Sequence, residues 1–170
     1  SSGSSYNRGG GIYCYNNSSP VFRNCIISGN LIQANNNDDI AHGGGIYSAY
    51  NTNLTIEGCV ISENTSKGEW YGQCYDGGIA FYGYELIIIQ TIISSNQLYT
   101  NSNNVYGSGA GIYLNDGSLT LTDSYIDDNT FSGNSSNWIS REYGGIYASN
   151  RTVEISNSEI TDNEFGGIKS

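Results

Sequence analysis

One short motif recurs along this chain at nearly constant spacing, and it limits the possible folds more than any other feature. Two small residues precede an aliphatic one in each copy, and the first copy reads Gly-Gly-Gly-Ile-Tyr. The aliphatic residues follow one another at spacings of 34, 33, 33, 34 and 22 residues; they are Ile12, Ile46, Ile79, Ile112, Ile146 and Ile168. Self-similarity at such a period indicates a solenoid of stacked coils.

A second motif, Ile-x-x-Asn, follows each of the first five copies. Between the two motifs apolar residues alternate with a period of two, which is typical of strands with one buried face. Alignment on the asparagines gives two further columns of core residues: Phe22, Ile56, Ile88, Leu121 and Ile155, and Ile27, Ile61, Ile93, Ile126 and Ile160. We expect the asparagines to form a structural ladder in which each amide bonds to the next coil; they are Asn30, Asn64, Asn96, Asn129 and Asn163.

These columns predict an all-β fold, a parallel β-helix of about five coils that forms a single domain over residues 1–170. The repeats begin near residues 9, 43, 76, 109 and 143, and a sixth starts at 165. Insertions lengthen the first four repeats, and we expect them to leave the coil at the same corner as a side wall; they span residues 31–42, 65–75, 97–108 and 130–142.

The pair of motifs resembles the GGAI and FxxN repeats of the chlamydial polymorphic outer-membrane proteins and related bacterial β-helix surface proteins. The resemblance covers nearly the whole chain, although Ile replaces Phe in all five copies of the second motif. It implies a right-handed helix and an adhesive role at a cell surface.

The amino-acid composition excludes some classes of binding partner. Sixteen acidic and six basic residues give a net charge of -10, which would repel nucleic acid and anionic membranes. No apolar run reaches eighteen residues, so we expect no membrane insertion. The chain begins without Met or an apolar leader, so we expect any export signal to have been removed or to lie outside this segment. An extracellular or cell-surface location is the prediction.

Aromatic residues supply the candidate binding surface. Four tyrosines follow the inward Ile and should form an outward column interrupted at Ala80; they are Tyr13, Tyr47, Tyr113 and Tyr147. The insertions add Trp70, Tyr71, Tyr99, Tyr106 and Trp138. An exposed column suits sugar rings or a partner protein, but neighbouring rings also stabilise β-ladders. For most of the insertion aromatics we favour packing against the coil.

Patterns for catalysis or metal binding are weak, and we expect no cofactor and no metal. His42 is the only histidine, and no nucleophile is placed beside it by sequence, so we expect neither a catalytic triad nor a zinc site. Asp123 with Asp127 or Asp128 could form an acid pair, and the acidic column of Glu63, Asp128 and Asp162 could bind calcium, but solvated turn carboxylates explain these residues better. Cys25 and Cys59 occupy the same position in consecutive coils, close enough for a possible disulfide.

The expected function is therefore that of a non-enzymatic extracellular protein whose aromatic surface binds a glycan or a surface or matrix protein. One alternative is a subunit that stacks head to tail on copies of itself in a filament or sheath. A second alternative is a polysaccharide lyase or hydrolase, because parallel β-helices host such enzymes. The sequence leaves the ligand, the anchoring, glycosylation and calcium binding open.

Overall fold

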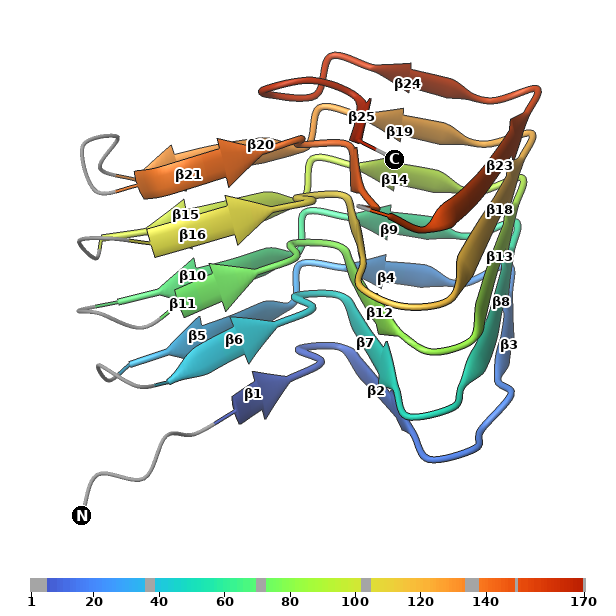
Figure 1. The fold of residues 1–170 in the computed structure, drawn as a ribbon, viewed down its shortest axis with the longest axis horizontal. Coiled ribbons are helices and arrows are strands. Elements are labelled where there is room, and N and C mark those ends of the chain that lie inside the picture. The colour runs from blue at the N-terminus through green and yellow to red at the C-terminus, as the bar shows by residue number, and fades with distance from the viewer. Residues whose placement is uncertain are drawn as a thin grey trace.

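The computed structural model describes residues 6–35, 39–69, 73–101, 105–133, 138–148 and 150–169. Its fold is the predicted one, an all-β, right-handed parallel β-solenoid, and the described residues contain no helix (Figure 1). About four turns carry an insertion. A fifth, shorter turn runs from β22 (Ile146–Tyr147) through β23 (Thr152–Ser156) and β24 (Glu159–Thr161) to β25 (Ile168–Lys169) without one. The expected count of five coils therefore differs only slightly.

Three parallel sheets form the body of the solenoid. The first contains β2 (Ile12–Tyr15), β7 (Ile46–Ala49), β12 (Ile79–Tyr82), β17 (Ile112–Leu114), β22 (Ile146–Tyr147) and β25. The second contains β3 (Val21–Arg23), β8 (Asn53–Glu57), β13 (Glu85–Ile89), β18 (Ser118–Thr122) and β23 (Thr152–Ser156). The third contains β4 (Ile26–Ser28), β9 (Val60–Ser62), β14 (Ile92–Ser94), β19 (Tyr125–Asp127) and β24.

The strand register pairs the aliphatic columns as the repeat alignment predicted. Ile46 pairs with Ile79, Ile56 with Ile88, and Ile61 with Ile93. All six of these side chains are fully buried in one continuous core. Because each coil buries its apolar face only against the coils above and below it, stacking supplies most of the hydrophobic stabilisation.

The asparagines of the second motif lie in a hydrogen-bonded ladder along the solenoid. The Asn64 amide donates to Oδ1 of Asn96 at 3.0 Å, and the Asn96 amide donates to Oδ1 of Asn129 at 3.0 Å. Each amide also donates to a backbone carbonyl of the preceding coil, as Asn96 does to Ile61 at 2.9 Å. These side chains are fully buried, and the ladder satisfies polar groups that would otherwise be unpaired.

Cys25 and Cys59 belong to a second ladder of hydrogen bonds along the solenoid. The Cys59 Sγ accepts a hydrogen bond from the backbone N–H of Cys25 at 3.4 Å, and Oγ1 of Thr91 accepts one from Cys59 N–H at 3.2 Å. Both thiols also donate to backbone carbonyls, in the way that Ser124 does two coils after Cys59. The cysteines therefore act as serine analogues. Both are free thiols, so the possible disulfide is not formed here.

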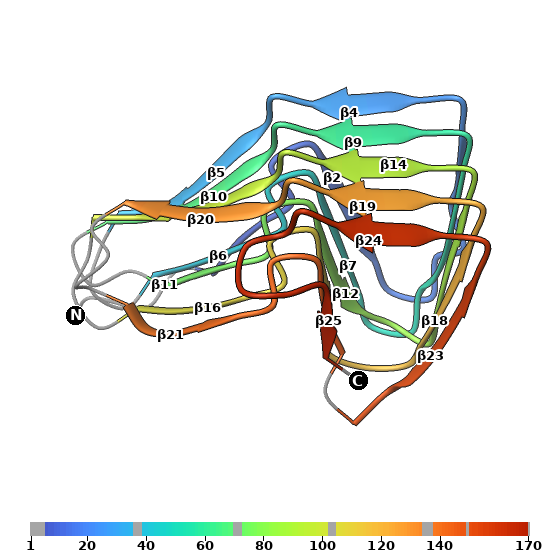
Figure 2. The ribbon, with the colours of Figure 1, turned by 90° about the horizontal axis from the view of Figure 1, so that it is seen from above.

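The four insertions are pairs of strands, and together with β1 they build a two-layered projection that we call the wing (Figures 1 and 2). One layer contains β5 (Leu31–Ala34), β10 (Thr65–Gly68), β15 (Gln97–Thr100) and β20 (Thr130–Gly133). The other contains β1 (Tyr6–Arg8), β6 (Ile40–His42), β11 (Gln73–Tyr75), β16 (Val105–Ser108) and β21 (Trp138–Glu142).

The wing has its own small core, separate from that of the body. Its members are Ile32, Ala34, Ala41, Cys74, Leu98, Ala110 and Phe131. Most of these side chains are small, so the two layers can pack closely. Figure 2 shows the wing projecting from one corner of the body, with β6 and β11 on the side that faces β7 and β12.

No helix in the described residues is long and apolar enough to cross a membrane.

Candidate functional site

The wing and the first body sheet meet at an angle, and aromatic side chains fill the corner between them. On the wing, the parallel register stacks Arg8, His42 and Tyr75 in one column across β1, β6 and β11. Tyr47 on the body lies beneath this column, with its ring 5.4 Å from the Arg8 guanidinium and 5.9 Å from the His42 ring. The Tyr75 ring reaches Tyr113 at 6.2 Å. The corner is thus built from residues far apart in sequence.

The body side of the corner is the tyrosine column expected from the repeat. The Tyr13 and Tyr47 rings stack at 5.5 Å with 14° between their planes. Tyr113 and Tyr147 stack at 5.2 Å with 5° between their planes. Exposure is uneven, however, because the wing covers the middle: Tyr13 is 47% exposed, whereas Tyr47 is only 4% exposed. The wing thus covers Tyr47 and leaves Tyr13 accessible.

The expected interruption at Ala80 is filled by another ring. Ala80 pairs with Tyr47 on one side and Tyr113 on the other, and its small side chain leaves space between their rings. Tyr82 is two residues further along β12, so its side chain points to the same face of the sheet. Its ring occupies that space, 5.4 Å from Tyr47 and 5.8 Å from Tyr113. The aromatic column is consequently continuous.

Tyr82 also meets a buried polar pair at the base of the wing. Its hydroxyl lies 3.1 Å from Nδ1 of His42, and the same nitrogen lies 3.2 Å from Oδ2 of Asp76. The His42 ring stacks on Tyr75 at 5.0 Å, which fixes its orientation. The other carboxylate oxygen of Asp76, Oδ1, is buried and has no hydrogen-bond partner within the part of the chain that the structure describes.

Asp76 occupies a corner position that three other coils give to glycine and that Tyr143 and Phe165 hold in the remaining two, also with positive φ. Its φ of 64° matches the values of 65° at Gly9, 68° at Gly43 and 66° at Gly109. An L-residue with positive φ is uncommon, and Asp tolerates it better than most. The third coil thus accepts both a strained backbone and a buried carboxyl, a combination that is frequent at functional sites.

Burial controls the protonation of this corner. It raises the pKa of the Asp76 carboxyl well above its usual range. Burial, together with the charge of Arg8, lowers the pKa of His42 to about 4. Burial likewise raises the pKa of Tyr47 to about 12 and raises that of Tyr82 further. The phenols therefore remain neutral hydrogen-bonding groups at physiological pH.

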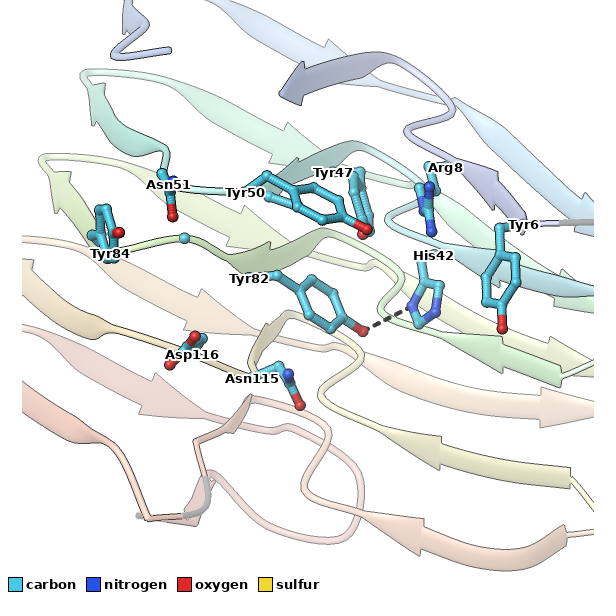
Figure 3. A pocket seen from close by; sticks show the side chains of 12 residues that line it. Tyr6, Arg8, His42, Tyr47, Tyr50, Asn51, Tyr82, Tyr84, Asn115 and Asp116 are labelled. Carbon is cyan, nitrogen blue, oxygen red and sulfur yellow. Dashed lines mark hydrogen bonds between the residues drawn. The ribbon is translucent and has the colours of Figure 1, made fainter. Parts of the chain in front are cut away.

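A pocket of about 440 Å³ opens beside this cluster, within the range of about 300–1,000 Å³ that small-molecule sites occupy. Figure 3 shows aromatic rings around it, with Arg8 and His42 from the wing and Asn115 and Asp116 from the turn after β17. The lining residues are Tyr6, Arg8, His42, Tyr47, Ala49, Tyr50, Asn51, Tyr82, Gly83, Tyr84, Asn115 and Asp116. The pocket thus combines flat apolar rings with hydroxyl, amide and charged groups.

The remaining aromatic candidates lie away from this pocket. Tyr99 is on β15 of the wing, where its hydroxyl donates to Asn101 and its ring lies 5.3 Å from the Lys67 ammonium. Tyr106 and Trp138 belong to β16 and β21, and the structure does not describe their side chains. Trp70 and Tyr71 lie outside the described residues.

Sequence reasoning missed the polar members of the corner: Arg8, His42, Asp76 and Tyr82. Their proximity depends on the angle between wing and body, which no repeat pattern reveals. One signal existed, since Asp76 stands where three other coils have glycine. The acid pair weighed for catalysis, Asp123 with Asp127 or Asp128, lies in and around β19 and does not line the pocket. Among the described residues, no three His, Cys, Asp or Glu side chains cluster as metal ligands would.

Comparison with known proteins agrees with the architecture. No curated protein and no solved structure matches the chain. The family model described as a right-handed β-helix region matches residues 2–170, nearly the full length. The finer resemblance to the polymorphic outer-membrane repeats receives no support from this match. With its parallel stacked strands and a match along almost the whole sequence, the chain belongs to the right-handed β-helix region family.

Proposed function

We propose that this chain is a non-enzymatic extracellular protein that binds a saccharide in the pocket between wing and body. The observation that carries the proposal is the aromatic lining of that pocket: Tyr47 and Tyr82 form its floor, and Tyr6, Tyr50 and Tyr84 stand exposed at its edges. The C–H faces of a sugar ring pack well on such flat rings.

Polar groups around the rings fit the rest of a sugar. Asn51, Asn115 and Asp116 offer amide and carboxylate groups, and the neutral tyrosine hydroxyls can donate and accept. A saccharide carries hydroxyls around its rim and C–H bonds on its faces, which matches rings bordered by polar side chains.

The size of the site favours a glycan over a folded protein partner. A pocket of about 440 Å³ holds a small molecule, whereas a stable protein interface needs a contact surface of about 800 Å² on each partner. The resemblance of the repeats to surface adhesins supports a role outside the cell and agrees with glycan attachment.

A matched pair of tyrosine variants tests the proposal. Tyr84 lines the pocket and is 60% exposed, whereas Tyr125 is 51% exposed on the third body sheet, outside the pocket. A glycan array with the wild-type protein should identify saccharide ligands. Tyr84→Ala should then weaken their binding by roughly 5- to 30-fold, equivalent to about 1–2 kcal/mol of lost ring contact. Tyr125→Ala should leave it unchanged. Equal effects of the two substitutions, or no saccharide ligand on a broad array, would reject the proposal.

Head-to-tail assembly is a second candidate, because the first and last coils expose large apolar side chains. Ile26 and Leu31 are exposed on the first coil, and Ile155 and Phe165 on the last. Contact between such surfaces would remove apolar area from water and continue the strand ladders. Negative-stain microscopy with light scattering tests this: filaments would support assembly, and discrete monomers at high concentration would reject it.

A further inference from the structure

Arg8 is the cationic side chain in the pocket lining, and its surroundings differ from those of Arg23, Lys67 and Arg151. Arg23 pairs with Glu57 at 2.7 Å, Lys67 with Glu69 at 2.5 Å, and Arg151 with Asp116 at 3.9 Å. Arg8 has no carboxylate partner among the residues that the structure describes.

The contacts of Arg8 are all with uncharged groups. Its guanidinium lies 5.1 Å from the Tyr6 ring and 5.4 Å from the Tyr47 ring. Figure 3 shows it between Tyr6 and Tyr47, next to His42. A guanidinium has five N–H donors, and Nε of Arg8 has no partner in the described part of the chain. Its charge and part of its donor capacity are therefore uncompensated.

The local charge of the pocket is opposite to that of the whole chain. Burial favours the neutral forms of both His42 and Asp76, because it lowers the pKa of the imidazole and raises the pKa of the carboxyl. Asp116 is at the other edge of the pocket and has Arg151 as its partner. Arg8 thus leaves a net positive charge in a pocket of a chain whose net charge is -10. A cationic ligand, which an aromatic pocket could otherwise attract, would be repelled here.

We propose that the saccharide bound in this pocket carries an anionic group, a carboxylate or a sulfate, and that Arg8 binds that group. The proposal rests on the proposed saccharide-binding function and specifies its ligand class. A planar guanidinium that already stacks on tyrosine rings can bind an oxyanion through two N–H donors while the sugar face packs on neighbouring rings.

The test compares disaccharides that share one core sugar in neutral, carboxylated and sulfated forms, with cores chosen from glucose, galactose and mannose. Binding is measured by calorimetry with wild type, Arg8→Gln, Arg8→Lys and the control Arg23→Gln. The wild type should bind an anionic form about 10- to 100-fold more tightly than its neutral parent, the range expected for charge-assisted hydrogen bonds. The stronger of the carboxylated and sulfated forms identifies the anion.

Arg8→Gln should abolish the preference for the anionic form over its neutral parent, while Arg8→Lys should keep part of that preference. Arg23→Gln should behave as wild type.

A purely structural Arg8 would predict equal loss of neutral and anionic binding, and that result would overturn the proposal. Equal wild-type affinity for neutral and anionic forms would also overturn it, while leaving saccharide binding itself intact. Failure of every disaccharide to bind, when array glycans do bind, would reject the anionic class. Absence of all glycan binding would reject both proposals.

Discussion

Replacing either member of the buried His42–Asp76 pair should change how the stability of the protein depends on pH. The two substitutions should change this dependence in opposite directions. The Asp76 side chain is completely buried and the His42 side chain is only 12% exposed, with 3.2 Å between Oδ2 and Nδ1. The pKa of Asp76 is raised by burial, and that of His42 is lowered to about 4 by burial and by Arg8. Both shifts favour the neutral form in the folded protein.

Counting protons gives the pH profile of the wild type. In the unfolded chain the two groups titrate at their ordinary pKa values of 3.8 and 6.5, so together they hold one proton between these values. Both shifts favour the form in which the folded pair also holds one proton there, so the slopes that the two groups give to the pH dependence of stability oppose each other between about 4 and 6.5. At higher pH only the raised pKa of Asp76 contributes, and it lowers stability as the pH rises toward that pKa. Below about 4 the unfolded chain holds two protons, so stability falls as the pH drops.

Each single substitution leaves one group whose pKa differs between the folded and the unfolded chain. In Asp76→Asn the histidine with its lowered pKa remains, so stability should fall as the pH drops from 6.5 toward 4. In His42→Asn the carboxyl with its raised pKa remains, so stability should fall as the pH rises above about 4. One proton changes stability by about 1.4 kcal/mol per pH unit, so with a His42 pKa of about 4 the change in Asp76→Asn reaches on the order of 2–3 kcal/mol between pH 4.5 and 6.5, and the change in His42→Asn has the opposite sign. For a chain of this size that corresponds to roughly 4–12 °C in Tm.

The assay is thermal or urea unfolding of the wild type and both variants at several pH values from 4.5 to 7.5. Subtracting the wild-type profile cancels the other titrating groups, which all proteins share. Asn tolerates positive φ as Asp does, so the backbone at residue 76 should remain. Asp116→Asn, which removes a carboxyl that is 67% exposed at the pocket edge, is the control and should show neither change. Profiles of both variants that run parallel to the wild type would refute the one-proton account.

Three further substitutions test the ladders and the core. Asn96→Ala leaves several buried partners unpaired and should destabilise by about 2–4 kcal/mol in urea unfolding, whereas the exposed Asn53→Ala should change stability little. Cys59→Ser preserves both hydrogen bonds of its ladder position and should change the unfolding free energy by less than about 1 kcal/mol; a loss above about 2 kcal/mol would mean that the sulfur has another role. Phe81→Ala removes the largest fully buried side chain and should lower stability by about 3–5 kcal/mol, far more than the partly exposed Ile92→Ala; similar losses would contradict the assigned core.

The body of the solenoid could be predicted from the sequence because the side chains of its core columns are large, apolar and regularly spaced. Ile46, Ile56 and Ile61 recur at fixed offsets in every coil, and a period of two cannot be satisfied by a helix. The wing lacked such a signal. Buried residues of its strands such as Ala34, Ser66 and Thr100 are small or polar. The alternation of buried and exposed positions is therefore not visible as an alternation of apolar and polar residues, and the composition resembles that of a loop.

The candidate site could be predicted only in part. The repeat put Tyr13, Tyr47, Tyr113 and Tyr147 in one column, because that position follows the inward Ile in each coil. It did not reveal Tyr82, since the space that it fills is made by Ala80. Which rings are covered, and which polar groups meet them, follows from the angle of the wing and is a property of tertiary packing.

The most direct test of the account is to map where a bound saccharide touches the protein. Amide chemical shifts measured by NMR during titration with a glycan selected on an array would report every contacted turn. Saccharide binding in the pocket predicts shift changes concentrated at Arg8, Asn51, Tyr84 and Asp116, with none along β19. Changes that instead centre on β19 and β24, with the pocket residues unaffected, would contradict the central claim that the corner between wing and body is the binding site.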